Sequence, residues 1–126
     1  MEHNHAKLER TLDSWISADW SDGVDLRELS PLDQLRITTS NNVYTLIVVS
    51  PYSGVVEARG GPLLSEFTTV RVCGSSLGCC GPLKCHVIHP GFCLELSHDE
   101  LGVIVTTPVQ DVAVSRADER KGAAVM

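Results

Sequence analysis

The sequence predicts a mainly β protein, built as a small antiparallel barrel or sandwich of six to seven strands with an N-terminal amphipathic helix. Between residues 33 and 115, several short runs alternate apolar and polar residues, which is the period of strands with one buried face. Turns rich in Gly, Pro and Asn separate these runs at a spacing of about 8–12 residues, which is typical of small all-β domains. No helix-length segment lies between the runs, so parallel βαβ units are excluded.

The first two strands and their turn show the pattern most clearly. Leu35, Ile37 and Thr39 alternate with polar residues. Ser40–Asn42 predicts a hairpin turn, because Asn tolerates a positive φ. Residues 43–49 are apolar on both faces, which predicts a strand that is buried on both sides or crosses from one layer to another.

The remaining strands follow at similar spacing. We expect them at residues 55–59, 68–73, 92–97, 103–107 and 109–114. Pro108 interrupts the last two, because proline has no amide hydrogen for a sheet ladder, and residues 109–114 are therefore expected at an edge.

Residues 1–32 predict a helix and a linker that precede the β-barrel-like domain at 33–115. Within residues 5–18, one face of a 3.6-residue period is apolar and consists of Leu8, Leu12, Trp15 and Ile16. In the linker, leucines recur every three residues at Leu26, Leu29, Leu32 and Leu35. That spacing predicts either a short helical turn packed on the mouth of the barrel or an extended linker. Residues 116–126 predict a flexible C-terminal tail.

Length and charge limit the function classes. A chain of 126 residues suffices for one domain with a core of its own. The formal net charge of −6 disfavours binding to nucleic acid and to anionic membranes, since both require Lys and Arg. No apolar run approaches the roughly 18 residues of a membrane span, and the N-terminus lacks the layout of a signal peptide. We therefore expect a cytoplasmic protein with reduced thiols; an odd number of cysteines, five, agrees with this.

Residues 73–93 contain all five cysteines and two histidines. Thiolates and imidazoles are the usual zinc ligands, and a candidate set is Cys80, Cys85, His89 and Cys93. The segment has no Cys-x-x-Cys pair, however, and free cysteine is also one of the most frequently buried residues. Three interpretations follow: thiols packed in the core, a metal site or a thiol-redox site. Packed thiols are favoured, so no cofactor is expected.

The chain resembles small bacterial β-domain proteins to which no activity is assigned, over roughly residues 35–114. The matching segments are Ile37–Tyr44, Arg59–Gly61, Val70–Gly78, Gly91–Leu96 and Val105–Val109. This resemblance implies a β fold and a bacterial origin, and adds no function.

A weaker resemblance is to PilZ domains, which are β-barrels that bind cyclic di-GMP. It rests on Ser75–Gly78, which supplies the Ser-x-x-Gly part of a PilZ motif. Cys73 occupies the Asp/Asn position of that motif, and no Arg-x-x-x-Arg segment is present to grip phosphate. A degenerate nucleotide-binding barrel is therefore a further alternative.

No pattern of residues predicts a catalytic group. The leading expectation is a non-enzymatic interaction or structural module, which contacts a protein partner or a second copy of itself through Leu8, Leu12, Trp15 and Ile16. Tryptophan is enriched in interfaces, which supports this assignment. The first alternative is a metal-binding or thiol-redox protein that uses residues 73–93.

Overall fold

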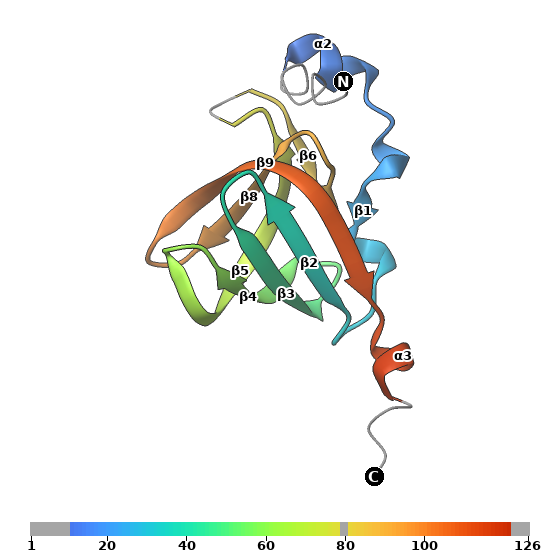
Figure 1. Cartoon of the computed structure of the whole chain (residues 1–126), viewed down its shortest axis with the longest axis vertical. Coiled ribbons are helices and arrows are strands. Elements are labelled where there is room, and N and C mark those ends of the chain that lie inside the picture. Colours follow the sequence, from blue (N-terminus) through green and yellow to red (C-terminus); the bar gives the residue numbers. More distant parts are fainter. Residues whose placement is uncertain (1–10, 79–80, 122–126) are drawn as a thin grey trace.

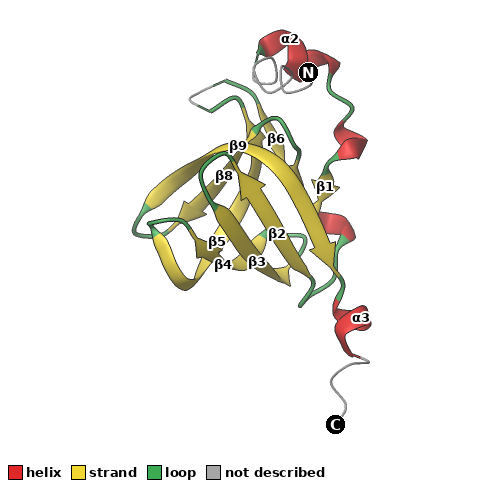
Figure 2. Ribbon diagram, viewed as in Figure 1, coloured by secondary structure: helices red, strands yellow, loops and turns green. Residues whose placement is uncertain are grey.

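The computed structural model describes residues 11–78 and 81–121, which fold as a mainly β structure with short helices at its periphery (Figures 1 and 2). All strand pairings are antiparallel. The larger sheet has seven strands: β2 (Gln34–Thr39), β3 (Val43–Ser50), β4 (Val55–Gly60), β5 (Leu64–Ser76), β6 (Leu83–Cys85), β8 (Cys93–His98) and β9 (Gly102–Ser115). A second sheet pairs β1 (Val24–Asp25) with β7 (Val87–Ile88).

Six strands follow one another in a closed sequence of pairings. The order of the large sheet is β4-β3-β2-β9-β8-β5-β6, and β4 also pairs with β5. Two long strands make this possible by changing partners along their length. β5 pairs with β4 up to Arg71 and with β8 from Arg71 onward. β9 pairs with β8 up to Pro108 and with β2 from Val109. Register shifts accompany both changes, as expected where strands bend from one group of strands to the next.

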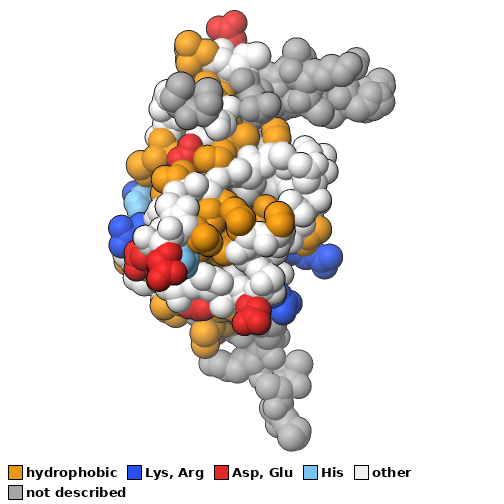
Figure 3. All heavy atoms as spheres, turned by 90° about the vertical axis from the view of Figure 1, so that its left-hand side faces the viewer, with side chains coloured by type: hydrophobic (Ala, Val, Ile, Leu, Met, Phe, Trp, Pro, Cys, Tyr) orange, Lys and Arg blue, Asp and Glu red, His pale blue; other side chains and the backbone are white. Residues whose placement is uncertain are grey.

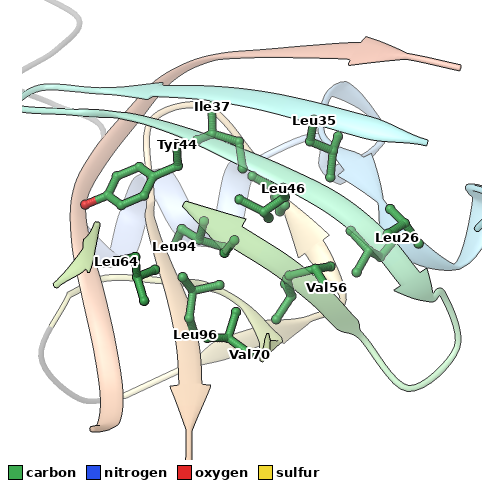
Figure 4. Close-up of a cluster of buried hydrophobic side chains, with 14 of the residues drawn as sticks. Leu26, Leu35, Ile37, Tyr44, Leu46, Val56, Leu64, Val70, Leu94 and Leu96 are labelled. Carbon is green, nitrogen blue, oxygen red and sulfur yellow. The ribbon is translucent and has the colours of Figure 1, made fainter. Parts of the chain in front are cut away.

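The core is aliphatic and is lined by alternate residues of the strands (Figure 4). Leu35 and Ile37 of β2 lie opposite Leu46 and Tyr44 of β3, and all four are buried. Burial of each large aliphatic side chain contributes about 1.5–3 kcal/mol to folding. The alternation predicted for residues 35–39 is therefore confirmed, and so is the position of the turn that joins these two strands. Its expected basis is wrong, since neither Asn41 nor Asn42 has a positive φ; the Thr39 hydroxyl accepts hydrogen bonds from both of their amides instead.

The expectation that residues 43–49 are buried on both faces is wrong. Tyr44, Leu46 and Val48 are buried, but Val43 and Val49 are 45% and 48% exposed. One face of β3 looks into the core that the strands enclose, while the other looks outward. The apolar residues of the outer face reflect the preference of β-branched side chains for extended backbone.

Pro108 does not interrupt the strand, so the expected break at this residue is wrong. Residues 109–115 have β2 as their only strand partner in the described part of the chain, as expected for an edge. β9 runs without a break from Gly102 to Ser115, and its second half lies beside β2. Pro108 stands where β9 changes partners, next to register shifts in both ladders, so its missing amide hydrogen costs no ladder hydrogen bond. Its carbonyl oxygen still accepts a hydrogen bond from the Ser40 amide at 3.2 Å.

The linker before β2 contributes to the core. A 3₁₀ turn at Leu26–Glu28 confirms the predicted short helical turn, and Leu26 and Leu29 are buried. The Leu26 amide donates to the carbonyl oxygen of His86 at 2.8 Å, beside the β1–β7 pairing. Leu32, the third leucine of the series, is 63% exposed, because the chain turns there with a φ of 74°.

Asp33 joins the start of β2 to the end of β9. This carboxylate is 2% exposed and accepts hydrogen bonds from the Ser30 amide at 2.9 Å and the Ala117 amide at 2.8 Å. Arg116 lies 3.8 Å from it. A short helix, α3 (Ala117–Lys121), begins at this contact, within the segment predicted to be a flexible tail.

Candidate interaction site

The N-terminal helix α2 (Leu12–Ser17) is shorter than the predicted residues 5–18. Residues 1–10, and with them the candidate Leu8, lie outside the described residues. A capping box begins the helix: the Ser14 amide donates to the Thr11 hydroxyl, and the Thr11 amide donates to the Ser14 hydroxyl, both at 3.0 Å. A helix of this length is marginal alone, so tertiary contacts must hold it.

Trp15 supplies those contacts. The centroid of its ring lies 4.6 Å from that of Trp20 and 5.1 Å from that of Phe92, and both pairs have edge-to-face geometry. Leu12 and Ile16 do not share this environment, since they are 57% and 72% exposed. The three described members of the predicted apolar face are therefore split: one anchors the helix, and two remain open to solvent.

Four rings form what we call the aromatic cluster: Trp15, Trp20, His89 and Phe92. Trp20 stacks on Phe92 with a centroid distance of 5.2 Å, and its ring centroid lies 5.1 Å from that of His89. The ring centroids of His89 and Phe92 are 5.4 Å apart. Aromatic pairs of this geometry contribute about 0.5–1.5 kcal/mol each beyond their buried area. The cluster therefore fastens residues 15–20 to the connection between β7 and β8.

His89 has a structural role in the aromatic cluster. Its Nε2 lies 3.0 Å from the carbonyl oxygen of Asp19, and its Nδ1 lies 2.6 Å from that of Pro90. Its amide donates to the Ser75 hydroxyl, which itself donates to the Val87 carbonyl oxygen. A carbonyl oxygen lies against each ring nitrogen, whereas a metal ligand must present a free lone pair to the ion.

The other candidate zinc ligands do not gather around His89. Cys85 is exposed on β6, and Cys93 is buried on β8, with β5 between these two strands. Cys80 lies outside the described residues. Within residues 11–78 and 81–121, no three His, Cys, Asp or Glu side chains group in a way that could hold a metal ion.

Two aspartates cap the turns on the N-terminal side of the aromatic cluster. Hydrogen bonds from the hydroxyl and amide of Ser21 lower the pKa of Asp19 below its ordinary value. Hydrogen bonds from the Arg27 side chain are the main cause of the lowered pKa of Asp25, which caps the Leu26–Glu28 turn. Lys84 adds a cation 5.7 Å from the Trp20 ring. Both carboxylates are therefore charged while they hold their turns.

Comparison with protein-family models, curated proteins and solved structures finds no match for this chain. No family is assigned. None of the helices in the described ranges is long and apolar enough to cross a membrane.

Sequence reasoning placed Trp15 on a helix face and Phe92 in a strand, but it did not bring them together. The available signal was composition: the chain has two tryptophans, two tyrosines and two phenylalanines. Both tryptophans and one phenylalanine meet in the aromatic cluster.

Proposed function

We propose that this chain is a non-enzymatic interaction module, in which a small β-barrel presents a short apolar helix face to a protein partner. The closed sequence of pairings through β2, β3, β4, β5, β8 and β9 supports the barrel description. One observation carries the function: Trp15 fixes α2 against the connection between β7 and β8, while Leu12 and Ile16 stay exposed.

The exposed pair has the spacing of a recognition helix. Residues 12 and 16 are four apart, so they lie one turn above the other on the same side of α2. Amphipathic helices that bind grooves use anchors at this spacing. Because the aromatic cluster already holds the helix, a partner gains these contacts with little ordering of the backbone.

The surface also indicates the size of the partner's contribution. A stable interface takes roughly 20–30 residues from each side, whereas α2 offers two large apolar residues on six helical positions. The fit is therefore to a hydrophobic groove in a partner that supplies most of the buried area. The charge of −6 supports a protein partner over a nucleic acid.

Site-specific photo-crosslinking tests this proposal. A benzophenone amino acid is placed at Ile16 and, as a matched control, at Val49, which is also exposed but lies on the outer face of β3. In an extract of the source cells we expect a discrete adduct from position 16 and none from position 49. Leu12→Ser should reduce the position-16 adduct at least tenfold.

The adduct's mass identifies the partner, and a mass of two chains would mean that a second copy occupies the helix. No adduct at position 16, or equal adducts at both positions, would overturn the proposal. Truncation before residue 33 is not a suitable test, because it would remove Leu26 and Leu29 from the core.

A further inference from the structure

The first half of β9 has a strand on one side only. Residues 102–108 pair with β8, while β2 pairs with β9 from Val109 to Ser115. Along residues 102–107 the opposite edge therefore faces no strand in the described part of the chain. This half of β9 lies at the left of Figure 1, near the turn between β4 and β5.

The register shows which backbone groups face this open edge. The Leu94 amide donates to the Thr106 hydroxyl at 3.1 Å, so the amide of Leu94 points toward β9. Amides alternate in direction along a strand, so the amide of Leu96 also points toward β9, where Ile104 lies opposite. The backbone N–H and C=O groups of Val103 and Val105 must then point to the open edge.

Apolar side chains surround this edge. Val103 and Val105 are 63% and 41% exposed, and Leu63, in the turn between β4 and β5, is 59% exposed. Figure 3 shows hydrophobic side chains gathered in the middle of this side of the molecule. A groove of about 220 Å³ lies between the two segments, lined in part by Tyr44, Leu63, Val105 and Thr107. The Thr107 hydroxyl oxygen is buried there and has no hydrogen-bond partner among the described residues.

Only the end of this edge near residues 106–108 carries protection against pairing, namely a register shift and Pro108. Natural edge strands carry lysine, proline or a bulge that prevents another strand from adding to them. Residues 102–107 read Gly-Val-Ile-Val-Thr-Thr, without charge or proline. Asp99 and Glu100 stand in the turn that precedes this segment.

We propose that this open edge of β9 pairs with the same edge of a second copy of the chain, antiparallel about a two-fold axis at Ile104. In this register Val103 lies opposite Val105 of the second copy, and Val105 lies opposite Val103 of the second copy. Both residues direct their backbone groups to the edge, so each pair exchanges two hydrogen bonds, and the valines form cross-strand contacts.

Charge placement supports a second copy as the occupant. With the axis at Ile104, Glu100 lies opposite Pro108 of the other chain and Asp99 lies opposite Val109. The acidic residues of the two chains therefore do not face one another, although the chain as a whole is acidic. Between residues 102 and 106, the pairing brings together only uncharged residues.

Sedimentation velocity of the full chain over a range of concentrations tests this inference. We expect a monomer–dimer equilibrium for the wild type. Val103→Lys combined with Val105→Lys should give a monomer at every concentration, because lysines would then face lysines across the axis. The matched control combines Val43→Lys with Val49→Lys, two similarly exposed valines on a strand that is paired on both sides, and should still dimerise.

A charge exchange tests the register itself. The double-lysine variant mixed with Val103→Glu/Val105→Glu should restore a dimer, since opposite charges then meet in both pairs. Circular dichroism of each variant verifies that the strands remain folded. A monomeric wild type, or a dimer that the edge variants leave intact, would overturn the inference. A dimer abolished by Leu12→Ser but not by the edge variants would assign self-association to α2 instead, so the two proposals fail separately.

Discussion

At the residue scale, Leu32 combines strain with exposure. Its φ of 74° lies in the left-handed region, which costs a residue with a Cβ about 1–2 kcal/mol. The turn is held because the Leu32 amide donates to the Val48 carbonyl oxygen at 2.8 Å. The side chain is 63% exposed and contributes little burial in return. Position 32 therefore suits a glycine better than a leucine.

Leu32→Gly should raise the free energy of unfolding by about 0.5–1 kcal/mol. Relief of the left-handed strain exceeds the extra backbone entropy of glycine in the unfolded chain, which is about 0.5–1 kcal/mol. Urea denaturation followed by circular dichroism measures the change. Leu32→Ala is the control, because alanine keeps the Cβ and should give no gain. A glycine variant no more stable than the alanine variant would contradict this account.

At the scale of elements, the N-terminal segment is a chain of short turns held by side chains. Asp19 caps the turn Trp20–Asp22, and Asp25 caps the turn Leu26–Glu28. Both turns lack the length to be stable alone, so their caps and the aromatic cluster act together. The lowered pKa values of these two aspartates mean that the folded segment favours their charged forms.

Acid should therefore loosen this segment before the strands unfold. A carboxyl whose pKa is lowered in the folded state contributes stability above its unfolded pKa, and this is lost as the pH falls through the folded pKa. Both tryptophans lie in the aromatic cluster, so their fluorescence reports on it directly. We expect steady emission above about pH 4 and a red shift below it.

Asp25→Asn should make this acid transition shallower, because one of the two titrating caps is gone. Asp111→Asn, at an exposed position on β9, serves as the control and should leave the transition unchanged. Emission that is independent of pH down to the unfolding of the strands would contradict the proposed role of the caps.

At the scale of the whole molecule, six strands pair in a closed sequence around an aliphatic core. β5 lies between the strands that carry Cys85 and Cys93, and both ring nitrogens of His89 face carbonyl oxygens. Any structural metal would have to draw these groups together, which would cost the contacts of the aromatic cluster.

Chelation should leave the melting temperature unchanged. Elemental analysis of protein purified without an affinity tag should find less than about a tenth of an equivalent of zinc, because bound structural zinc contributes directly to folding. One equivalent of zinc, lost together with a fall in melting temperature after chelator, would restore the metal hypothesis for residues 73–93.

The strands around Leu35 and Leu94 could be predicted from sequence, because alternation every two residues reports directly which side chains share a buried face. The leucine spacing around Leu26 left a short helical turn and an extended linker both open, and the structure shows the turn. The bounds of β5 could not be predicted from the sequence. Residues 68–73 show the alternating pattern, but the strand extends from Leu64 to Ser76, because its two ends pair with different strands.

By itself, the sequence determined the fold class, the faces of most strands and the position of the helix anchor Trp15. Only the tertiary structure decided that β9 continues through Pro108, that Trp15 and Trp20 meet Phe92, and that the edge at Val103 and Val105 is open. The physical reason is that side-chain periodicity is local, whereas the choice of pairing partner depends on residues far apart in the chain. Contacts between residues 15 and 92, or between β2 and β9, leave no local pattern to read.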